Sequence, residues 1–322
     1  MILALAGGVG GAKLANGLTT LLDVDDLLVV VNTGDDFEHF GLPISPDLDT
    51  VLYTLAGVNN PDTGWGLLGE TWEFMNTVER LGEETWFRLG DRDLATHVLR
   101  ARGFGSGHSL SRITTDLAQQ YGVNHPIVPM SDQKVRTIVE TDMGSLPFQI
   151  YFVREKCEPL AKAVTYEGAS EAQPSEAFSV ALDNRDISAI IICPSNPLLS
   201  IAPILALPNV KARLRAHMAP VVAVSPIIGG RAIKGPAAKM FSEMKLESSA
   251  LGVAIYYRDI LDGIVIDLQD SRLVSAISSM GIRVKTTNIV MESTSDQTRL
   301  ADEVLEFARL ISDANECKAG DL

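Results

Sequence analysis

The chain has 322 residues, of which 46% are hydrophobic and 21% charged, a composition typical of a globular protein with a large buried core. Its formal net charge of −14 argues against nucleic-acid binding, which usually needs a basic face. No apolar run approaches the roughly 18 residues of a membrane span, so we expect none. The six apolar residues at the start lack a preceding basic segment and predict a buried strand rather than a signal peptide. Three cysteines without paired spacing favour a reducing compartment, and we expect a cytoplasmic protein.

Continuous apolar runs recur along the chain and end in glycine, proline or polar clusters. They are residues 2–6, 26–32, 187–193, 220–225 and 263–268. Unbroken runs of this length are typical of strands that are covered on both faces. Most are followed by helical patterns, and this alternation predicts an α/β fold with a Rossmann-like, doubly wound, mainly parallel sheet.

The middle of the chain is richer in tryptophan, glycine and short irregular segments. It contains strand candidates near 147–153 and 161–166 and helix candidates near 70–80 and 91–102. We therefore predict a core of residues 1–57 and 181–322 and an inserted smaller α+β lobe of residues 58–180. The lobe is expected to cover the ligand cleft of the core.

The first strand runs into a glycine-rich segment, with Gly7, Gly8, Gly10 and Gly11 followed by Lys13. A helix that begins after such a turn offers free N–H groups and a positive dipole end to an anion. The dinucleotide pattern fails because Lys13 stands at its third glycine position, and the P-loop pattern fails because no serine or threonine follows the lysine. Phosphate binding is favoured, and a tight turn without a ligand is the alternative.

Acidic residues follow the second strand, where Asn32, Thr33, Asp35 and Asp36 should face the same crevice as the glycine loop. Carboxylates such as these suit Mg²⁺, which takes oxygen ligands. A solvated turn fits the same residues equally well.

A helix is predicted to begin at Ser45, with Ser45 as its N-cap and Pro46 as its first residue. Asp47 then lies in the first turn, where a favourable interaction with the helix dipole explains it without a function. Asp49 points elsewhere around the helix and is not explained as a cap. Asp49 is therefore the better functional candidate.

A second helix start is predicted at Asp91, and Asp93 and His97 are spaced to pair on one face of that helix. A third metal ligand at a sensible spacing is missing, so metal binding by His97 is not favoured. Arg88 and Arg92 flank the preceding turn and suit bidentate contact with carboxylate or phosphate. Solvent-facing salt bridges explain them equally well.

Two turn-rich loops follow later strands, at residues 193–204 and 225–239. Ser195, Asn196 and Ser225 offer hydrogen bonds there, and Lys234 offers charge. Turn chemistry alone is the alternative explanation. No serine–histidine–aspartate order or catalytic cysteine pattern is apparent.

Seven sequence blocks together resemble one family. They are "GGVGGAK", "VVVNTGDD", "SPDLDTVLYTLAG", "LGDRDLATH", "VPMSD", "PSNPLLSIAPIL" and "VSPIIGG". In order, from residue 2 to about 295, they resemble the 2-phospho-L-lactate transferase family (CofD/FbiA) of coenzyme F-420 biosynthesis. The glycine and "NTGDD" blocks look more like the bacterial FbiA branch than the archaeal one.

The resemblance implies an activity. The family transfers a phospho-hydroxy-acid unit (2-phospholactate, phosphoenolpyruvate or 3-phosphoglycerate) from a GDP-linked donor to the ribityl hydroxyl of the deazaflavin FO. GMP is released, and Mg²⁺ is required. A homodimer is the corresponding expectation for the assembly.

The resemblance also implies residue roles. Asp36 and Asp49 are expected to hold Mg²⁺ and serve catalysis, and Asp49 and Arg88 to contact FO. Arg88 stands where archaeal members carry lysine, so the charge is kept and the geometry is not. The expected substrate-binding residues are Gly8, Gly10, Gly11 and Lys13 near phosphates, Ser195, Asn196 and Ser225 on the guanosine diphosphate side, and Asn32 and Thr33 at the end of the second strand.

Two other protein classes share parts of this pattern. A nucleotide-sugar-binding regulator similar to the YvcK-type gluconeogenesis factors would share the fold and the glycine loop, but "SPDLDTVLY" and "LGDRD" argue against it. An NAD-dependent oxidoreductase would need the missing third glycine. It would also need a ribose-binding acid where Val31 and Asn32 stand.

Overall fold

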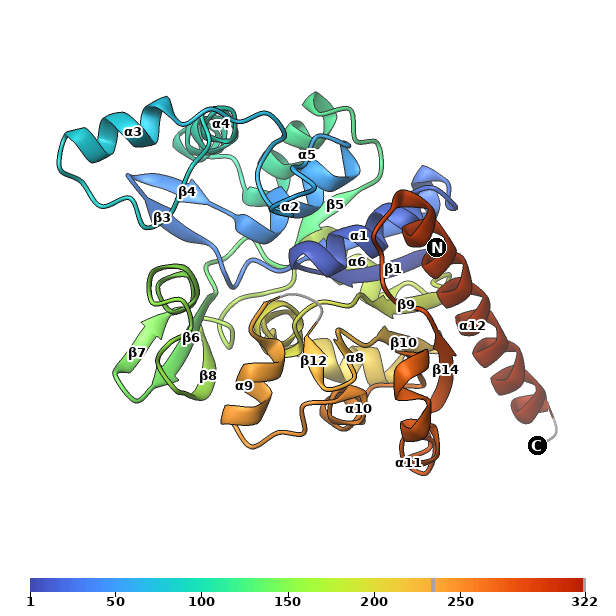
Figure 1. The fold of residues 1–322 in the computed structure, drawn as a ribbon. Coiled ribbons are helices and arrows are strands. Elements are labelled where there is room, and N and C mark those ends of the chain that lie inside the picture. The colour runs from blue at the N-terminus through green and yellow to red at the C-terminus, as the bar shows by residue number, and fades with distance from the viewer. Residues whose placement is uncertain (233–234, 321–322) are drawn as a thin grey trace.

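The computed structural model describes residues 1–232 and 235–320 and is built around one seven-stranded sheet in which every neighbouring pair is parallel (Figure 1). The strand order is β14-β13-β10-β9-β1-β2-β5. The strands are β1 (Ile2–Ala6), β2 (Leu27–Val31), β5 (Ile127–Pro129), β9 (Ala189–Ile192), β10 (Val221–Val224), β13 (Gly263–Asp267) and β14 (Arg283–Thr287). The predicted α/β fold and the five predicted strands are confirmed, and β5 and β14 complete the two edges.

Helices cover both faces of the sheet, which is why its strands are apolar throughout. Leu3 and Leu5 of β1 point into one hydrophobic core, and Ile2 and Ala4 point into the other. One face is covered by α1 (Gly8–Thr19), α2 (Pro46–Leu55), α5 (Leu110–Gln120) and α12 (Thr294–Gly320). The other is covered by α6 (Glu176–Asp183), α7 (Ala202–Ala206), α8 (Val210–Ala216), α10 (Ala250–Tyr257) and α11 (Val274–Ser278). Within the described part of the chain, no helix is long and apolar enough to cross a membrane.

The chain reverses its winding direction between β1 and β9. From β1 it proceeds to β2 and β5 on one side, and β9 returns to pair with the other side of β1. The loops that leave the carboxyl ends of β1 and β9 therefore diverge and leave a crevice, the usual ligand site of an open α/β sheet.

Smaller elements stand beyond the carboxyl edge of the sheet. An antiparallel sheet of order β7-β6-β8 lies at the left of Figure 1, below the β3–β4 hairpin. These elements are β3 (Phe37–His39), β4 (Leu42–Ile44), β6 (Arg136–Thr141), β7 (Gly144–Pro147), β8 (Ala161–Glu167), α3 (Glu73–Arg80), α4 (Asp93–Gly105) and α9 (Ala237–Glu243). Short elements complete the set: the hairpin β11 (Ile227–Ile228) and β12 (Arg231–Ala232), the 3₁₀ turns η1 (Val24–Asp26) and η4 (Leu268–Leu273), and the π-helical turns η2 (Ile150–Arg154) and η3 (Pro197–Ile201).

Most of the predicted elements outside the core are found, with two corrections. The helices near 70–80 and 91–102 correspond to α3 and α4, and the strand near 161–166 to β8. The strand predicted at 147–153 is wrong, because β7 ends at Pro147 and η2 follows. Phe148 and Tyr151 are buried while Phe152 is exposed, a helical spacing that a short apolar run does not reveal.

The predicted helix start at Asp91 is also wrong. The Asp91 carboxylate accepts hydrogen bonds from the backbone N–H groups of Glu73 and Phe74, and so it stabilises the first turn of α3. Glu70 takes the corresponding place at α4, where its carboxylate accepts from the N–H groups of Arg92 and Asp93. Asp91, which precedes α4, thus stabilises the start of α3, and Glu70, which precedes α3, stabilises the start of α4. Each helix start lies beside the loop that precedes the other helix.

Strand β5 lies inside the segment 58–180 and joins the central sheet through β2. The antiparallel sheet β7-β6-β8 lies in the same segment. The division of the chain into a core and an inserted lobe with these boundaries stays a prediction.

Close packing between α1 and α12 generates a stability prediction at Gly17. Glycine in a helix interior usually costs about 1 kcal/mol relative to alanine, but a Cβ at Gly17 would lie 2.2 Å from the carbonyl oxygen of Gln297. We expect Gly17→Ala to lower the free energy of unfolding by about 1–3 kcal/mol, as overpacking does. Chemical denaturation measures this. The control is Gly105→Ala in α4, where a Cβ meets nothing within 4 Å and stability should stay the same or rise; equal effects at the two sites would contradict the packing argument.

Candidate active site

A cavity of about 830 Å³ opens at the carboxyl edge of the sheet, beside the point where the winding reverses. Its wall combines the first turn of α1, the start of α2, the loop after β9 and residues 289–292 after β14. Trp65, Trp86, Phe87, Phe148 and Phe152 give it an aromatic side. The volume and the mixture of apolar walls with a few polar groups are typical of a small-molecule site.

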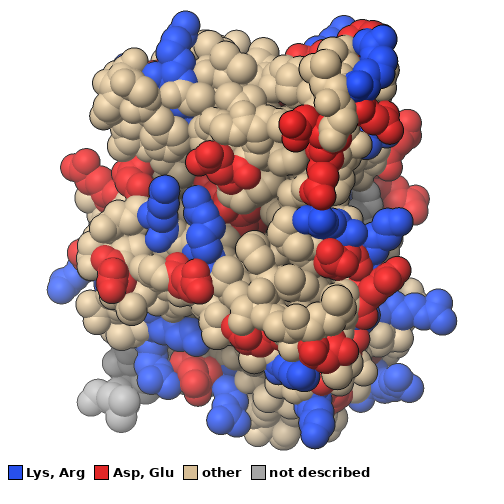
Figure 2. Space-filling view, turned by 90° about the vertical axis from the view of Figure 1, so that its left-hand side faces the viewer, with Lys and Arg blue, Asp and Glu red and all other residues tan. Residues whose placement is uncertain are grey.

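Charges of both signs are interspersed on the face shown in Figure 2, the left-hand side of Figure 1. Acidic and basic side chains alternate there, and neither kind covers a continuous area. An anionic ligand that approaches this face therefore meets no broad positive field. Its charge must be recognised by local groups inside the cavity.

The glycine-rich segment is the first turn of α1 rather than a loop, because α1 begins at Gly8. The N–H of Gly8 donates to Asp47 Oδ1 at 2.8 Å, and the N–H of Gly7 donates to Ser195 Oγ at 3.1 Å. The Lys13 ammonium donates to the carbonyl oxygen of Met291 at 2.6 Å. Part of the helix N-terminus is thus already bonded within the protein, and phosphate binding here stays a prediction.

Packing explains why these positions are glycine. A Cβ at Gly10 would lie 2.3 Å from the carbonyl oxygen of Pro194, and one at Gly11 would lie 2.4 Å from Ser195 Oγ. Gly8 has a φ of 62°, in the left-handed region that disfavours other residues. The first turn of α1 therefore lies directly against the loop that follows β9, and these glycines bring the two sides of the crevice together.

Asp47 has a larger role than the sequence indicated. Besides the N–H of Gly8, its carboxylate accepts from Asn32 Nδ2 at 3.0 Å, and it lines the cavity. Burial raises the pKa of Asp47, and the hydrogen bonds from Asn32 and Gly8 oppose that shift. The helix-dipole explanation of Asp47 is therefore incomplete, because this side chain joins α1, the end of β2 and α2.

Asp36 is buried behind the cavity wall and accepts a hydrogen bond from Ser45 Oγ at 2.9 Å. Ser45 precedes α2 and Pro46 is its first residue, as predicted, but the serine side chain bonds Asp36 instead of capping the helix. Burial raises the pKa of Asp36 to about 7, although the positive charges of Arg136 and Arg100 oppose the shift.

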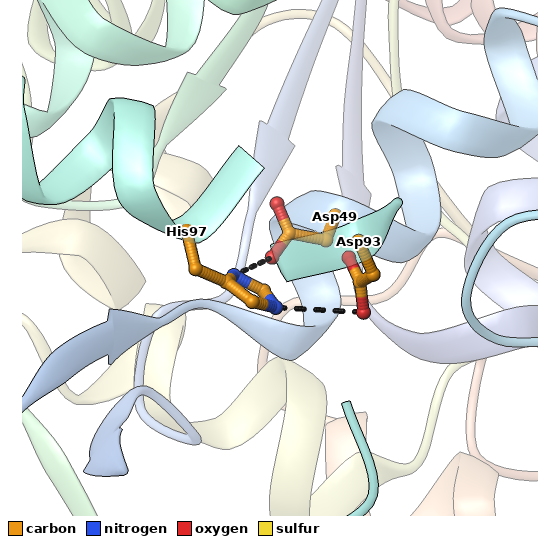
Figure 3. Close-up of side chains that lie close together, drawn as sticks. All are labelled: Asp49, Asp93 and His97. Atoms are coloured by element: carbon orange, nitrogen blue, oxygen red, sulfur yellow. Dashed lines mark ion pairs between the residues drawn. The ribbon is translucent and has the colours of Figure 1, made fainter. Parts of the chain in front are cut away.

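Asp49 belongs to a buried cluster with Asp93 and His97 (Figure 3), and Arg100 is the fourth member of this cluster. Its Oδ1 accepts a hydrogen bond from Arg100, and its Oδ2 lies 3.7 Å from His97 Nδ1. His97 Nε2 lies 3.4 Å from Asp93 Oδ2, so the predicted pairing of these two residues on one helix face is confirmed. Burial raises the pKa of Asp49, and the charge of Arg100 opposes the shift.

The same cluster brings Asp49 to two residues of α4, Asp93 and His97, and the three are potential metal ligands. Ligand atoms of Asp49, Asp93 and His97 lie within 4.8 Å of one another. The Arg100 guanidinium bonds Asp49 and lies 3.2 Å from His97 Nδ1. A positively charged side chain of the protein therefore already compensates the negative charge of this cluster. This favours an arginine-centred network over a metal centre of these three residues.

Oxygen atoms that suit a hard divalent cation occur on Asp36 and Asp49. Among the described residues, Asp36 Oδ1 and Asp49 Oδ2 are buried without a hydrogen-bond partner, and so is Asp35 Oδ1. The charge of Asp49 adds to the raised pKa of Asp36, so the two carboxylates act on each other electrostatically. Unpartnered carboxylate oxygens are the ligands that Mg²⁺ takes, and the residues present fit this ion.

Arg88 lines the cavity, with its guanidinium carbon 4.0 Å from the centre of the Trp72 ring. It stacks on the face of that ring, and its chain neighbours Trp86 and Phe87 also line the cavity. Arg92 is different, because its Nη1 donates to the carbonyl oxygen of Leu68 and it does not line the cavity.

The loop after β9 presents Ser195 and Asn196 to the cavity. Asn196 Oδ1 accepts from the N–H groups of Leu198 and Leu199, and its buried Nδ2 has no partner in the described chain. A fixed, unused donor of this kind suits an anionic oxygen of a ligand. Ser225 does not reach the cavity, since its hydroxyl donates to the carbonyl oxygen of Ile227.

The structure thus gathers part of the predicted site at one cavity. The predicted residues that line it are Gly7, Gly8, Gly10, Lys13, Asp35, Asp49, Arg88, Ser195 and Asn196. Those that do not are Gly11, Asn32, Thr33, Asp36 and Ser225. Lys234 lies outside the described residues. The roles of all of them in binding or catalysis stay predictions.

Sequence reasoning missed Arg100, Tyr53 and the aromatic wall. Arg100 is three residues after His97 on α4, a spacing that places two side chains on one helix face and offered a signal. Its partner Asp49 is 51 residues away in the chain, and only the fold brings them together.

The parallel sheet reverses its winding direction between β1 and β9, and a large cavity opens at that point. These features are typical of an α/β protein that binds small molecules. Residues 2–299 match the family model "2-phospho-L-lactate transferase CofD", and the chain belongs to this family of transferases. The resemblance found in the sequence blocks is thereby confirmed.

Named relatives cover almost the whole chain. A phosphoenolpyruvate transferase of Kitasatospora aureofaciens is 38% identical over 96% of this chain and 98% of its own. A 2-phospho-L-lactate transferase of Methanosarcina acetivorans is 38% identical over 94% and 98%. A crystal structure of a UPF0052 family member from Bacillus halodurans shares the fold, with a TM-score of 0.62 at 15% identity over 94% of this chain and 98% of that one.

The buried carboxylate of Asp36 generates a prediction about pH. Its pKa of about 7 in the folded protein exceeds the ordinary value of 3.8, so the folded state binds more protons than the unfolded state between pH 4 and 7. Stability contributed by this group is present at low pH and lost as the pH rises. We expect Asp36→Asn to raise the free energy of unfolding, relative to that of the unchanged protein, by up to about 4 kcal/mol more at pH 8 than at pH 4. Denaturant titration at both pH values, in the presence of EDTA, measures this difference.

The control for this prediction is Asp91→Asn. Hydrogen bonds from Thr71 and from the N–H of Phe74 lower the pKa of Asp91, so its stabilisation is present at neutral pH and lost as the pH falls. Asp91→Asn should therefore destabilise the protein at pH 7 and less at pH 3. A variant of Asp36 with the same pH trend as the Asp91 variant would refute the burial argument.

Proposed function

We propose that the protein transfers a phospho-hydroxy-acid unit from a GDP-linked donor to the ribityl hydroxyl of the deazaflavin FO, with release of GMP, in coenzyme F-420 biosynthesis. The observation that carries the proposal is the convergence, in one cavity of a chain of this family, of the α1 N-terminus, the unused Asn196 amide and Asp49. A donor diphosphate and an acceptor alcohol both find suitable groups there.

The names of the relatives bear on the transferred acid. Similar bacterial proteins are named phosphoenolpyruvate transferases, and similar archaeal proteins are named 2-phospho-L-lactate transferases, at nearly equal identity to this chain. Phosphoenolpyruvate and 2-phospholactate are therefore both candidates, and 3-phosphoglycerate is the third. These acids differ by small groups, between which a pocket discriminates modestly.

The proposed reaction is a displacement at phosphorus. The ribityl oxygen forms a bond to the phosphorus that carries the hydroxy acid, the bond from that phosphorus to the oxygen shared with GMP breaks, and GMP leaves with that oxygen. The hydroxyl proton passes to solvent. Such a reaction depends on alignment and on stabilisation of charge more than on a covalent contribution of the protein.

The chain supplies groups for alignment on both sides of the cavity. Asn196 Nδ2 is assigned to donate to a phosphate oxygen, and the carboxylate of Asp49 to orient the acceptor hydroxyl. The unpartnered atoms of both side chains at the cavity lining support these assignments. Arg88, Trp86 and Phe87 all line the cavity, and this aromatic and cationic side suits the ring system of FO. The aromatic wall also keeps water from the reacting groups.

Mg²⁺ is the proposed cofactor, held by Asp36 and Asp49. When bound, it neutralises charge on the diphosphate of the donor. The buried, unpartnered oxygens of both carboxylates support this assignment. A homodimer in the cytoplasm is the further expectation from the family.

A turnover assay tests the proposal. Purified protein, FO and Mg²⁺ are mixed with each of the three GDP-linked donors, and products are followed by mass spectrometry. We expect one donor to give the coupled product and GMP, with activity lost in EDTA. Asp49→Asn should lower kcat by about 100-fold or more, since it alters a group placed at the reacting hydroxyl.

The matched control is Asp116→Asn, a surface carboxylate of α5 that pairs with Arg112 and does not line the cavity. Its turnover should equal that of the unchanged protein. Full activity of a folded Asp49→Asn variant would remove Asp49 from the reaction. Donor binding without product from any of the three acids would contradict the proposal and favour the nucleotide-sugar-binding regulator.

A further inference from the structure

Arg100 is the largest fully buried side chain of the described protein, with 2% of its surface exposed. It extends from α4 toward α2 and β4. Its guanidinium donates to Asp49 Oδ1, to the carbonyl oxygen of Pro43 at 3.3 Å and toward His97 Nδ1 at 3.2 Å. One planar group thus ties three elements of the cavity wall together.

A chain of polar contacts extends behind Arg100. Because a guanidinium only donates hydrogen bonds, His97 Nδ1 must accept, and the ring proton lies on Nε2. That nitrogen faces Asp93 Oδ2 at 3.4 Å, and Asp93 Oδ1 accepts from the Tyr53 hydroxyl at 2.6 Å. The order of contacts is Tyr53, Asp93, His97, Arg100, Asp49.

This order fixes the orientation of the Asp49 carboxylate. Arg100 occupies Oδ1, which leaves Oδ2 as the oxygen that the described chain does not satisfy. Rotation of the carboxylate would break its bond to Arg100, and Arg100 is itself held by Pro43 and His97. Asp49 therefore presents one defined oxygen at the cavity wall.

Stability alone is a weak reason for such a network. Removing two charges from water costs several kcal/mol, and a well-packed apolar pair at the same place is often as stable or more stable. A buried ion pair beside a ligand cavity is better explained by the orientation that it imposes. Arginine suits this task because its fork makes several fixed hydrogen bonds at once, which lysine does not.

We infer that Arg100, held in place by His97 and Asp93, is a positioning residue that sets the orientation of Asp49 toward the divalent cation and the acceptor hydroxyl. The inference rests on the proposed function for the identity of the reaction. In this role Arg100 acts through Asp49 and does not contact a substrate directly.

The experiment uses Arg100→Lys, which keeps the charge and loses the fork, together with Asp49→Asn and the double variant. For Arg100→Lys we expect kcat to fall at least about tenfold, because small misplacements of a reacting group are costly. The KM for the acceptor should change less than threefold. Binding of Mn²⁺ without substrates, followed by electron paramagnetic resonance, should weaken about tenfold, as it does when a group that orients a metal ligand is changed.

The double variant separates positioning from a structural role. If Arg100 acts through Asp49, Asp49→Asn with Arg100→Lys should be no slower than Asp49→Asn alone. His97→Gln should give a smaller loss of kcat than Arg100→Lys, and Tyr53→Phe a smaller loss still. The effects would then follow the order of contacts rather than the loss of thermal stability.

Arg213→Lys is the matched control. Arg213 bonds Asp183 and Ser179, and none of these three residues lines the cavity. It should lose thermal stability but keep kcat and Mn²⁺ affinity. Arg100→Lys with unchanged kcat and Mn²⁺ affinity overturns the inference, and so do additive losses in the double variant or an absence of Mn²⁺ binding by the unchanged protein.

Failure of the proposed function gives a different result. If no donor yields product but Mn²⁺ binding depends on Asp49 and weakens in Arg100→Lys, the reaction is wrong and the positioning role of Arg100 stands. The cation measurement contains neither FO nor a donor, so it does not depend on the identity of the substrates.

Discussion

The burial of several carboxylates at one edge of the sheet is the constraint on which this structure depends. Asp35, Asp36, Asp47 and Asp49 are all buried, and burial raises the pKa of each of them. Such charges destabilise a folded protein unless hydrogen bonds or opposite charges compensate. Much of the local architecture can be understood as that compensation, because a backbone N–H, an amide, a hydroxyl and an arginine donate hydrogen bonds to three of them, Asp36, Asp47 and Asp49.

The same compensation holds the elements of the site together. Asp47 joins the first turn of α1 to the end of β2, and Asp49 joins α2 to α4 through Arg100. The α1 turn also lies against the loop after β9, where the N–H of Gly7 donates to Ser195 Oγ, and only glycine allows this approach at Gly10. Glycine is therefore needed here for the approach of two backbone segments, whether or not a phosphate also binds.

The fold was largely predictable from the sequence, because continuous apolar strands followed by helices leave few other arrangements. The strand expected at 147–153 failed because a short, mostly apolar segment fits a helical turn equally well. The site was predictable where a residue follows a strand, as Asn196 does. It was not predictable where burial or long-range pairing decides the role. A favourable interaction with the helix dipole seemed to explain Asp47, and Arg100 meets Asp49 across 51 residues.

Several buried carboxylate oxygens without a hydrogen-bond partner in the described chain lie in the region of the proposed chemistry. Unsatisfied oxygens on Asp35, Asp36 and Asp49 are features that a structure selected for stability alone would avoid. A divalent cation would satisfy them and at the same time offset the burial that raises the pKa of Asp36. By linkage, a ligand that binds only the folded state adds to its stability. The cost of the buried carboxylates in the free protein and the proposed affinity of the site for a cation are therefore two aspects of one electrostatic arrangement. Arg100 reduces the cost by neutralising one carboxylate, and it leaves the second oxygen of that carboxylate open.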